Sequence, residues 1–483
     1  MNIKAISTNV GKALLVSALF MFLSVIVSLL NGRDSALGPL LISSIITFTV
    51  GAFPFIFVRK TYPVSMRDGY LIIFLSWVLS FIFGMLPYVL WGGEFTLVNA
   101  WFESVSGYTT TGATILTDIE AVPKSLLFWR SSTHFIGGLG VVVFLLLVLP
   151  DASPFRLRLT NLEISSLSRE GYRFRSAQTV RIIFSVYIGL AVVETLLLWL
   201  AGMSLFDAVN HSFSTVATGG FSTHNASIAY FQSDLISAII LFFMVISAMH
   251  FGVIYAVVVK GSFKVLRSPV LRYYLSFLAV LTLLLSISLR VNGNCSSWAR
   301  ALFESAFQIS AFTTTTGFGL TDNAGYPLFA GALLMIACIQ CGCSGSTSGG
   351  LKADRVLIVG KGLVSEIRRM LHPSSISQVR VGGHPIADST VKSILLFVVV
   401  YVMTIVISAI LMMACGMDGL EAVSGAIASV GNAGPALGSI GTMGNYSAVP
   451  AMAKLICCFD MFLGRVEIFP VLTVFSMIFE RQK

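Results

Sequence analysis

SGYTTTG, at residues 106–112, is the first of four related segments that lie between long apolar stretches of this chain. The others read STVATGGF (214–221), SAFTTTTGF (310–318) and SVGNAGP (429–435). Each of these tips ends a short amphipathic stretch, and the stretches cover about 97–112, 204–222, 299–319 and 418–438. Such pieces are too short to cross a membrane and too apolar to be ordinary loops, which is typical of re-entrant segments.

One glycine in each tip defines the register that we expect for the repeat. These glycines are Gly112, Gly219, Gly317 and Gly434, at intervals of 107, 98 and 117 residues. A single loop glycine is usually only a turn residue, and a lone TTG is a weak signal. Four tips, each with a half-helix before it and a span after it, are hard to obtain by chance and predict a repeated structural unit.

The chemistry of the tips follows from the membrane around them. Non-helical backbone at membrane depth leaves carbonyl groups that need a partner, and a dehydrated cation can be that partner. Four loops around one axis supply rings of carbonyl oxygens, glycine lets successive carbonyls turn inward, and the preceding half-helices aim their negative ends at the axis. The predicted ion-coordinating residues are Thr110, Thr111, Gly112, Ala217, Thr218, Gly219, Thr315, Thr316, Gly317, Asn432, Ala433 and Gly434.

Composition places the whole chain in a membrane. Of its 483 residues 56% are hydrophobic and only 11% charged, and the mean hydropathy is +0.88; a soluble domain carries about 25% charged residues. The first apolar run, from Ala13 to Leu30, is read as a retained span because no small-residue cleavage site follows it. Ten segments are long enough to cross: about 13–30, 38–58, 69–91, 126–149, 182–201, 235–259, 274–291, 328–350, 393–415 and 450–478.

The charges indicate the orientation. Of the 31 Lys and Arg residues, 24 fall in one alternating set of loops, whereas only Arg33, Lys124 and Arg300 fall in the opposite set. This asymmetry predicts that both termini lie in the cytoplasm, so the net charge of +9 needs no nucleic acid to explain it. The two long cytoplasmic segments, 150–181 and 351–392, are expected to form short helices and loops at the membrane face.

We therefore predict an all-α integral membrane protein of ten transmembrane helices. Four repeats of span, pore helix and span follow two extra N-terminal helices. The expected divisions are 1–66 for the N-terminal addition, 67–150, 151–262 and 263–370 for the first three repeats, and 371–483 for the fourth.

Two features lie where the third and fourth repeats would pass beneath the tips. The run CGCSGSTSGG (341–350) makes a poor helix, since each glycine costs about 1 kcal/mol relative to alanine. It is either a break that puts polar backbone in the pore or a flexible helix end. Arg465 sits in the last span, where a charge usually faces a cavity and has a partner. Pairing with Glu467 is the alternative, although side chains two residues apart point to different helix faces.

Other polar residues in the spans are weaker candidates. We expect a core or interface role for His134 and His250, and for Arg130 either an interfacial anchor or a pairing with a nearby carboxylate. The cysteines at 338, 341 and 343 fit small-residue packing better than a metal site, because no fourth Cys or His is near in the sequence.

These residues resemble the Trk/Ktr/HKT superfamily of cation transporters, and within it the TrkH branch. The resemblance covers essentially the whole chain and rests on YTTTGAT (108–114), the other three tips, CSGSTSGGLK (343–352) and GRVEIFP (464–470). TrkH-like proteins are similar in carrying two extra spans before the repeats.

The resemblance implies potassium uptake across the bacterial inner membrane, a homodimer with one pore per subunit, and a cytosolic TrkA-type nucleotide-binding regulatory partner. In this superfamily a serine at the first-tip glycine accompanies sodium transport, so four glycines favour potassium; a sodium or unselective transporter of the same fold is the alternative. An enzyme would need an intramembrane catalytic cluster, whereas the ionisable residues here are scattered. The implied gating residues are Gly342, Cys343, Ser344, Gly345, Ser346, Thr347, Ser348, Gly349, Gly350 and Arg465.

Overall fold

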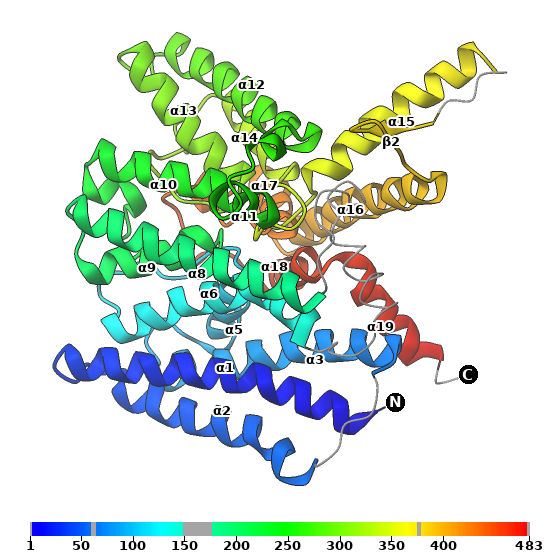
Figure 1. Cartoon of the computed structure of the whole chain (residues 1–483). Helices are drawn as coiled ribbons and strands as arrows, with labels where there is room; N and C mark the ends of the chain where they lie inside the picture. The colour runs from blue at the N-terminus through cyan, green and yellow to red at the C-terminus, as the bar shows by residue number, and fades with distance from the viewer. Residues whose placement is uncertain (1, 59–63, 148–175, 374–377, 481–483) are drawn as a thin grey trace.

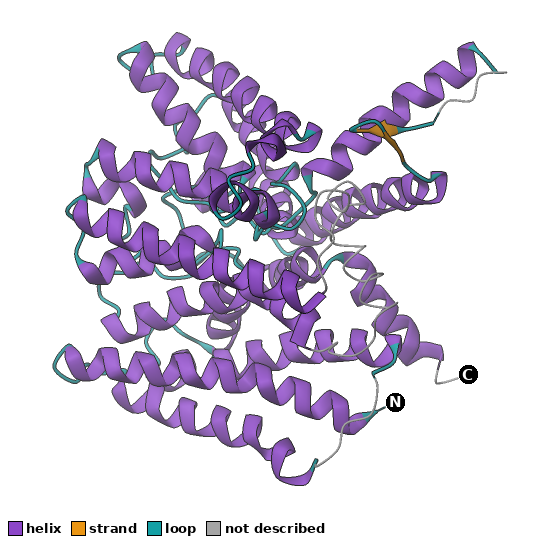
Figure 2. Cartoon of the chain, in the orientation of Figure 1, coloured by secondary structure: helices purple, strands orange, loops and turns teal. Residues whose placement is uncertain are grey.

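The computed structural model describes residues 2–58, 64–147, 176–373 and 378–480, and these residues are almost entirely helical (Figures 1 and 2). A single two-residue hairpin interrupts the helices, with β1 (Arg380–Val381) antiparallel to β2 (His384–Pro385). The all-α prediction is confirmed for this part of the chain. Of the two long segments predicted to be cytoplasmic, the described part of 351–392 forms a helix, the hairpin and the start of another helix, whereas 150–175 lies outside the described residues.

Long apolar helices make up the outer wall. Six helices within the described residues are long and apolar enough to cross a membrane, and one bent pair could form a seventh span. Large side chains such as Phe22, Ile45, Leu200 and Ile407 point outward and are exposed, as expected of a surface that faces lipid. The chain is therefore a multi-pass membrane protein. The six are α1 (Ile3–Leu30), α2 (Leu37–Phe57), α3 (Met66–Gly84) with its continuation α4 (Leu86–Trp91), α8 (Ser176–Leu200), α12 (Pro269–Val291) and α16 (Asp388–Ala414). Helix α6 (Lys124–Leu147) is also long, but much of it is buried inside the protein, for example at Leu126 and Trp129.

Four shorter helices lie inside this wall and match the predicted half-helices. They are α5 (Leu97–Tyr108), α9 (Leu205–Val216), α13 (Trp298–Thr313) and α17 (Gly419–Gly431). Each starts at a polar residue whose side chain accepts a backbone N–H of the first turn, namely Thr96, Ser204, Ser297 and Asp418. These caps satisfy donors that the helix itself cannot. Their last residues are buried, so all four helices end inside the protein.

Three segments are broken where a straight span would be simplest. Helix α10 (Asp234–Ser247) meets α11 (Phe251–Val258) at 110°, so the predicted continuous span 235–259 was wrong. The predicted span 450–478 is likewise divided, into α18 (Ala451–Val466) and α19 (Ile468–Glu480). A longer break separates α14 (Leu328–Ile339) from α15 (Ala353–Leu371), as the glycine-rich run predicts. Three short 3₁₀ turns complete the fold: η2 (Ser227–Phe231), η3 (Phe263–Arg267) and η4 (Gly438–Ile440).

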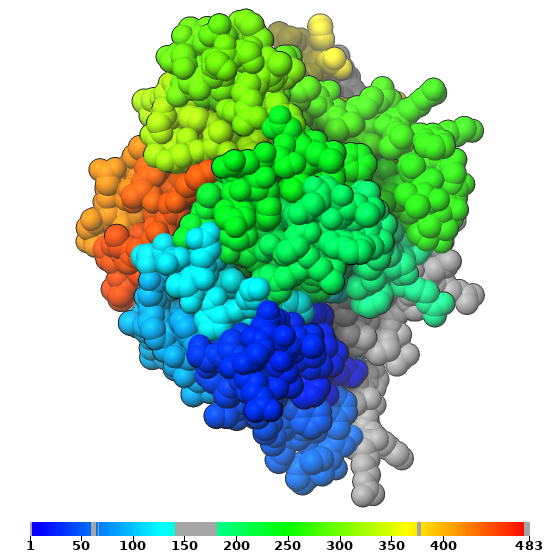
Figure 3. Space-filling model, turned by 90° about the vertical axis from the view of Figure 1, so that its left-hand side faces the viewer, coloured from blue at the N-terminus to red at the C-terminus, as the bar shows by residue number. Residues whose placement is uncertain are grey.

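The N-terminal hairpin of α1 and α2 lies at one end of the molecule, where α1 packs against α3 and α6 (Figures 1 and 3). The two helices approach closely, because a Cβ atom on Gly11 would lie 2.5 Å from the carbonyl oxygen of Gly51. Helix α1 also reaches α5, where the Tyr108 hydroxyl bonds the Ser17 hydroxyl at 2.8 Å. The hairpin therefore packs directly behind the first tip.

Candidate functional site

The four tips share one backbone conformation directly after their helices. Each has a non-glycine residue in the left-handed region: Thr110 (φ 53°), Thr218 (φ 56°), Thr315 (φ 61°) and Asn432 (φ 55°). Such residues are uncommon, and they persist only where the surroundings fix them. Two residues later the first three tips have a left-handed glycine: Gly112 (φ 81°), Gly220 (φ 84°) and Gly317 (φ 76°). Reversing the sign of φ at alternate residues lets successive carbonyls face the same side of the chain.

This pattern corrects the register of the second tip. The predicted repeat aligned Gly219 with Gly112, but the structural counterpart of Gly112 is Gly220, so the second tip is shifted by one residue. Gly219 then corresponds to Thr111 and keeps a place in the row of tip residues, whereas Ala217 falls one position earlier than its assigned partner. The Gly-Phe pair at 220–221, which matches Gly-Phe at 317–318, is the sequence signal that could have found the register. The residue at this position is still glycine in all four tips.

The glycines bring the tips into a closed ring. A Cβ atom on Gly112 would overlap the carbonyl oxygen of Gly219, and one on Gly220 would overlap that of Thr316. Continuing around the ring, a Cβ on Gly317 would lie 2.6 Å from Cδ of Pro435, and one on Gly434 would lie 2.7 Å from the carbonyl oxygen of Thr111. Each tip thus touches the next, and the fourth touches the first. Larger residues cannot be accommodated at these positions without moving backbone.

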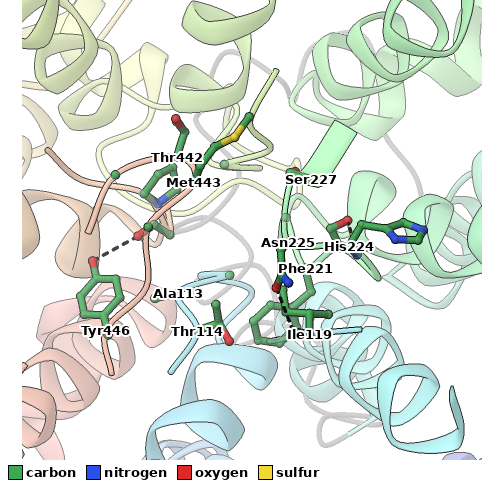
Figure 4. A pocket seen from close by; sticks show the side chains of 18 of the residues that line it. Ala113, Thr114, Ile119, Phe221, His224, Asn225, Ser227, Thr442, Met443 and Tyr446 are labelled. Carbon is green, nitrogen blue, oxygen red and sulfur yellow. Dashed lines mark hydrogen bonds between the residues drawn. The ribbon is translucent and has the colours of Figure 1, made fainter. Parts of the chain in front are cut away.

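The chain that leaves each tip closes the same ring a second time. Tyr446 N–H donates to the Thr114 carbonyl at 2.8 Å, and the Tyr446 hydroxyl donates to the Gly434 carbonyl at 3.1 Å (Figure 4). Ile119 N–H donates to the Asn225 side chain at 2.8 Å, which joins the first and second repeats (Figure 4). The remaining links are Ile228 N–H to the Gly319 carbonyl at 3.1 Å and the Thr442 hydroxyl to the Thr321 carbonyl at 2.8 Å.

A pocket opens over this ring on the side of the exit segments. All four tips line it, through Gly112, Gly220, Gly317 and Gly434. Its rim includes Thr114, Phe221, Asn225, Met443 and Tyr446, which Figure 4 shows around the opening. The site is therefore a mouth that leads to four converging loops, and it can hold a small ion or water above a set of backbone carbonyls.

The predicted glycine-rich break lies directly beneath the tips. It runs from residue 340 to 352 and is closed at its base by a bridge between Gln340 and Leu351. Gly349 N–H donates to the Thr315 hydroxyl at 3.0 Å, and the Thr347 hydroxyl donates to the carbonyl of Val216, the last residue of α9, at 3.0 Å. The loop therefore touches the lower end of two tips. A flexible helix end at the membrane face does not describe it.

The bend between α10 and α11 holds the loop from the other side. Cys343 N–H donates to the Ala248 carbonyl at 2.9 Å, and Phe251 N–H donates to the Gly345 carbonyl at 3.1 Å. His250 caps α11, accepting from Gly252 N–H at 2.9 Å. This structural role of the partly buried His250 agrees with the predicted core or interface role. The bend that breaks the predicted span 235–259 is thus what fixes the loop.

Arg465 joins this loop to the first repeat. Its guanidinium donates to the Thr347 carbonyl at 2.6 Å and to the carbonyl of Gly137, in α6, at 2.8 Å, and the side chain is buried. Glu467 instead pairs with Arg355 at 2.6 Å, so the alternative of an Arg465–Glu467 pair was wrong. A buried cation thus lies between the loop and α6 beneath the tips.

The remaining candidates have structural partners. The His134 ring lies 3.1 Å from the Ser214 hydroxyl and stacks on Phe221 at 4.0 Å, which confirms a core role. Arg130 pairs with the buried carboxylate of Glu103 at 2.7 Å, confirming the second of its two expected roles. Glu103 itself was missed from sequence, because one acid in a pore helix gives no pattern. Within the described residues no three His, Cys, Asp or Glu side chains are grouped to bind a metal.

The fold and the site define a class: a membrane protein with four inward half-helices whose tips meet over a broken helix. Comparison with known proteins agrees. The cation transport protein family TrkH matches residues 40–293 and 294–483. A crystal structure of the potassium transporter TrkH from Vibrio parahaemolyticus superposes with a TM-score of 0.88, at 32% identity over 98% of each chain.

Curated relatives extend over the same length. The Trk system potassium uptake protein TrkH of Halomonas elongata is 34% identical over 486 residues and all of both chains. That of Salmonella typhimurium is 33% identical over 427 residues, or 88% of each chain. The chain belongs to the TrkH family of cation transport proteins.

Proposed function

We propose that this chain takes up potassium ions as the membrane subunit of a Trk-type system, through a pore whose filter is the ring of four tips. The observation that carries the proposal is the closed contact of the tips, in which each glycine abuts the next tip. Such a ring fixes several rows of carbonyl oxygens around one axis, and these can replace the water shell of a cation. The relatives named as potassium uptake proteins support the choice of ion. A transporter needs no catalytic cluster, so the chain is not proposed to be an enzyme.

The coordinating residues are proposed from the corrected register. Gly220 joins the set as the equivalent of Gly112 in the second tip, and Ala217, which was also predicted, moves to the inner edge. The other members are the predicted Thr110, Thr111, Gly112, Thr218, Gly219, Thr315, Thr316, Gly317, Asn432, Ala433 and Gly434. The transported ion is potassium, and no further cofactor is invoked.

Growth of a potassium-uptake-deficient bacterium at low potassium tests the proposal. With its cytosolic partner present, the wild-type chain should restore growth, and Gly112→Ser should not. The serine Cβ would overlap the carbonyl oxygen of Gly219, so the first and second tips must move apart. Gly325→Ser is a matched control, because nothing lies within 4 Å of a Cβ there. Failure of the wild type to restore growth would contradict the proposal.

Sodium competition separates the alternative, a sodium or unselective transporter of the same fold. Rubidium uptake by the wild-type chain should be unaffected by excess sodium if the filter selects potassium. Inhibition of rubidium uptake by sodium would favour the alternative. In Gly112→Ser we expect sodium to inhibit, because the distorted ring no longer holds its carbonyls at fixed positions.

The gate is proposed to be the loop at 342–350 together with Arg465. The loop lies under two tips, and Arg465 ties it to α6. A fixed cation beside the path raises the energy of a passing potassium ion, and a loop that is not part of a helix can move aside when its hydrogen bonds break. We propose that the cytosolic TrkA-type nucleotide-binding partner controls this movement.

The finer architecture is part of the same proposal. Ten spans, with four repeats after two extra helices, place both termini in the cytoplasm of the bacterial inner membrane, and two copies form a homodimer with one pore each. Inward movement of one positive charge across 100 mV yields about 2.3 kcal/mol, which can drive accumulation without ATP. Reporters that are active only in the cytoplasm, fused to either end, should both be active; an inactive one would contradict the topology.

A further inference from the structure

A buried ion pair stands behind the first tip. Glu103 lies on pore helix α5 and Arg130 on α6, and their side chains are 0% and 1% exposed, with 2.7 Å between Glu103 Oε1 and Arg130 Nε. Burying two charges is costly unless the remaining donors and acceptors are also satisfied. Both side chains meet this condition with partners in the segments that leave the tips. The ion pair is therefore hydrogen-bonded to the segments that leave the tips and is part of the site.

Glu103 holds the exit of the first tip. Its carboxylate accepts from the Thr114 hydroxyl at 3.0 Å and from Ile115 N–H at 3.1 Å. Thr114 follows Gly112 by two residues and lines the pocket over the ring. Because a carboxylate accepts stronger hydrogen bonds than a neutral group, this end of the first tip is fixed to its own pore helix.

Arg130 connects the first tip to the second. Its guanidinium contacts the Thr114 hydroxyl at 3.2 Å and donates to the Ser222 carbonyl at 3.3 Å, while its planar face lies 4.0 Å from the ring of Phe221. Ser222 and Phe221 directly follow Gly220. One guanidinium thus reaches both sides of the contact between Gly112 and the second tip.

The same position carries a polar residue behind three of the tips. Glu103, His211 and Gln308 each stand nine residues before the tip glycines Gly112, Gly220 and Gly317. His211 contacts the Ser222 hydroxyl at 2.9 Å, and Gln308 donates to the Thr321 carbonyl at 2.8 Å. In the second and third repeats the side chain at this position bonds the exit segment of its own repeat. Of these three residues only Glu103 has, in the described part of the chain, a charged partner, Arg130, that also bonds the neighbouring tip.

We propose that Glu103 and Arg130 are a positioning pair that sets the preference for potassium over sodium, by holding the first and second tips at a fixed separation. The inference rests on the proposed function, because it takes the tips as the filter. We take the size of the site to set selectivity: a ring of carbonyls then favours the larger ion only while it cannot contract around the smaller one. Glu103 also neutralises the guanidinium of Arg130, which lines the pocket and would otherwise repel a cation there.

The test compares rubidium and sodium uptake by purified protein in liposomes, and the readout is the ratio of the two rates. In Arg130→Gln the ties to both tips are lost, and we expect the ratio to fall about tenfold, equivalent to about 1.4 kcal/mol. Arg130→Lys keeps the charge but loses the planar guanidinium that reaches both tips, so the rate ratio should fall by less than in Arg130→Gln. Thr114→Val removes only the hydroxyl between the two side chains and should lower the ratio a few-fold. Glu304→Gln is the control, since Glu304 pairs with Arg300 on the third pore helix, where the pair is partly exposed.

The outcomes separate this inference from the proposed function. A pair that served only to stabilise the fold would lower the amount of folded protein, measured by gel filtration, and leave the rate ratio unchanged. An unchanged ratio in Thr114→Val and Arg130→Lys, with a potassium-selective wild type, overturns the inference alone, even where Arg130→Gln fails to fold. A wild type with no preference for rubidium over sodium overturns the proposed function and this inference with it.

Discussion

Replacement of Arg465 by methionine is the sharpest test of the proposed gate. The guanidinium donates one hydrogen bond to the loop, at Thr347, and one to α6, at Gly137. Methionine has a similar length and no donor, so both bonds are lost without leaving a large void. Opening the loop breaks only the bond to Thr347, because the bond to Gly137 does not involve the loop. A hydrogen bond to a charged group contributes about 1.5–3 kcal/mol, so without it the closed position of the loop loses up to about 3 kcal/mol.

This magnitude predicts the result. A change of up to about 3 kcal/mol shifts a two-state equilibrium by up to roughly 100-fold, so a gate that is open about 1% of the time without its partner becomes open up to about half of the time. Rubidium uptake into liposomes, measured without the cytosolic partner, should therefore rise by about an order of magnitude or more. Loss of the cation beside the path acts in the same direction.

Two further variants separate the effect of the two Arg465 hydrogen bonds from the effect of its charge. Arg465→Lys keeps the charge but can reach only one carbonyl well, so its uptake should lie between that of the wild type and that of Arg465→Met. Arg272→Gln is the matched control, because this exposed arginine also donates twice to a backbone carbonyl, that of Arg267, away from the tips. Wild-type uptake by a folded Arg465→Met protein would refute the gate.

Two other predictions concern the breaks in the helices. Glu467 has φ 67°, so the Glu467→Ala protein should unfold at a lower temperature than the Glu467→Gly protein. Both variants lose the bond to Arg355, but only alanine bears about 1 kcal/mol of strain at this positive φ. The reverse order in thermal unfolding would contradict the prediction. In Gly349→Ala the new Cβ would lie 2.6 Å from Cβ of Asn432, so the loop must move from the fourth tip, and rubidium uptake without the partner should rise several-fold. Gly360→Ala, with nothing within 4 Å, should leave uptake unchanged, and equal uptake in both variants would contradict the prediction.

The pore helices could be predicted because their signals are local. Each is an amphipathic stretch too short to span, and each observed helix lies within or beside its predicted range. The glycine-rich break was predictable for the same reason, since four glycines between 342 and 350 disfavour a helix wherever they occur. Length and residue type were sufficient for these elements.

The other two breaks could not be predicted, because their partners are distant in the sequence. Residues 247–251 read SAMHF and are apolar enough to continue a span. The bend there is held by Ala248 and Phe251 bonding Cys343 and Gly345, almost a hundred residues away. Glu467 is likewise held by Arg355, 112 residues earlier. A local pattern contains neither partner, so hydropathy shows only one continuous apolar run.

The four tips of the ring are held by different polar residues. Identical tips could be held identically, but in one chain each tip meets a different neighbour. The position nine residues before the tip glycine is Glu103 in the first repeat, His211 in the second, Gln308 in the third and Gly425 in the fourth. The fourth repeat uses Asn432 instead, whose side chain donates to the Met461 carbonyl at 2.7 Å and to the Thr111 hydroxyl at 3.2 Å. The polar residues behind the tips therefore differ because the contacts they make differ, and selectivity should be altered by different substitutions in each repeat.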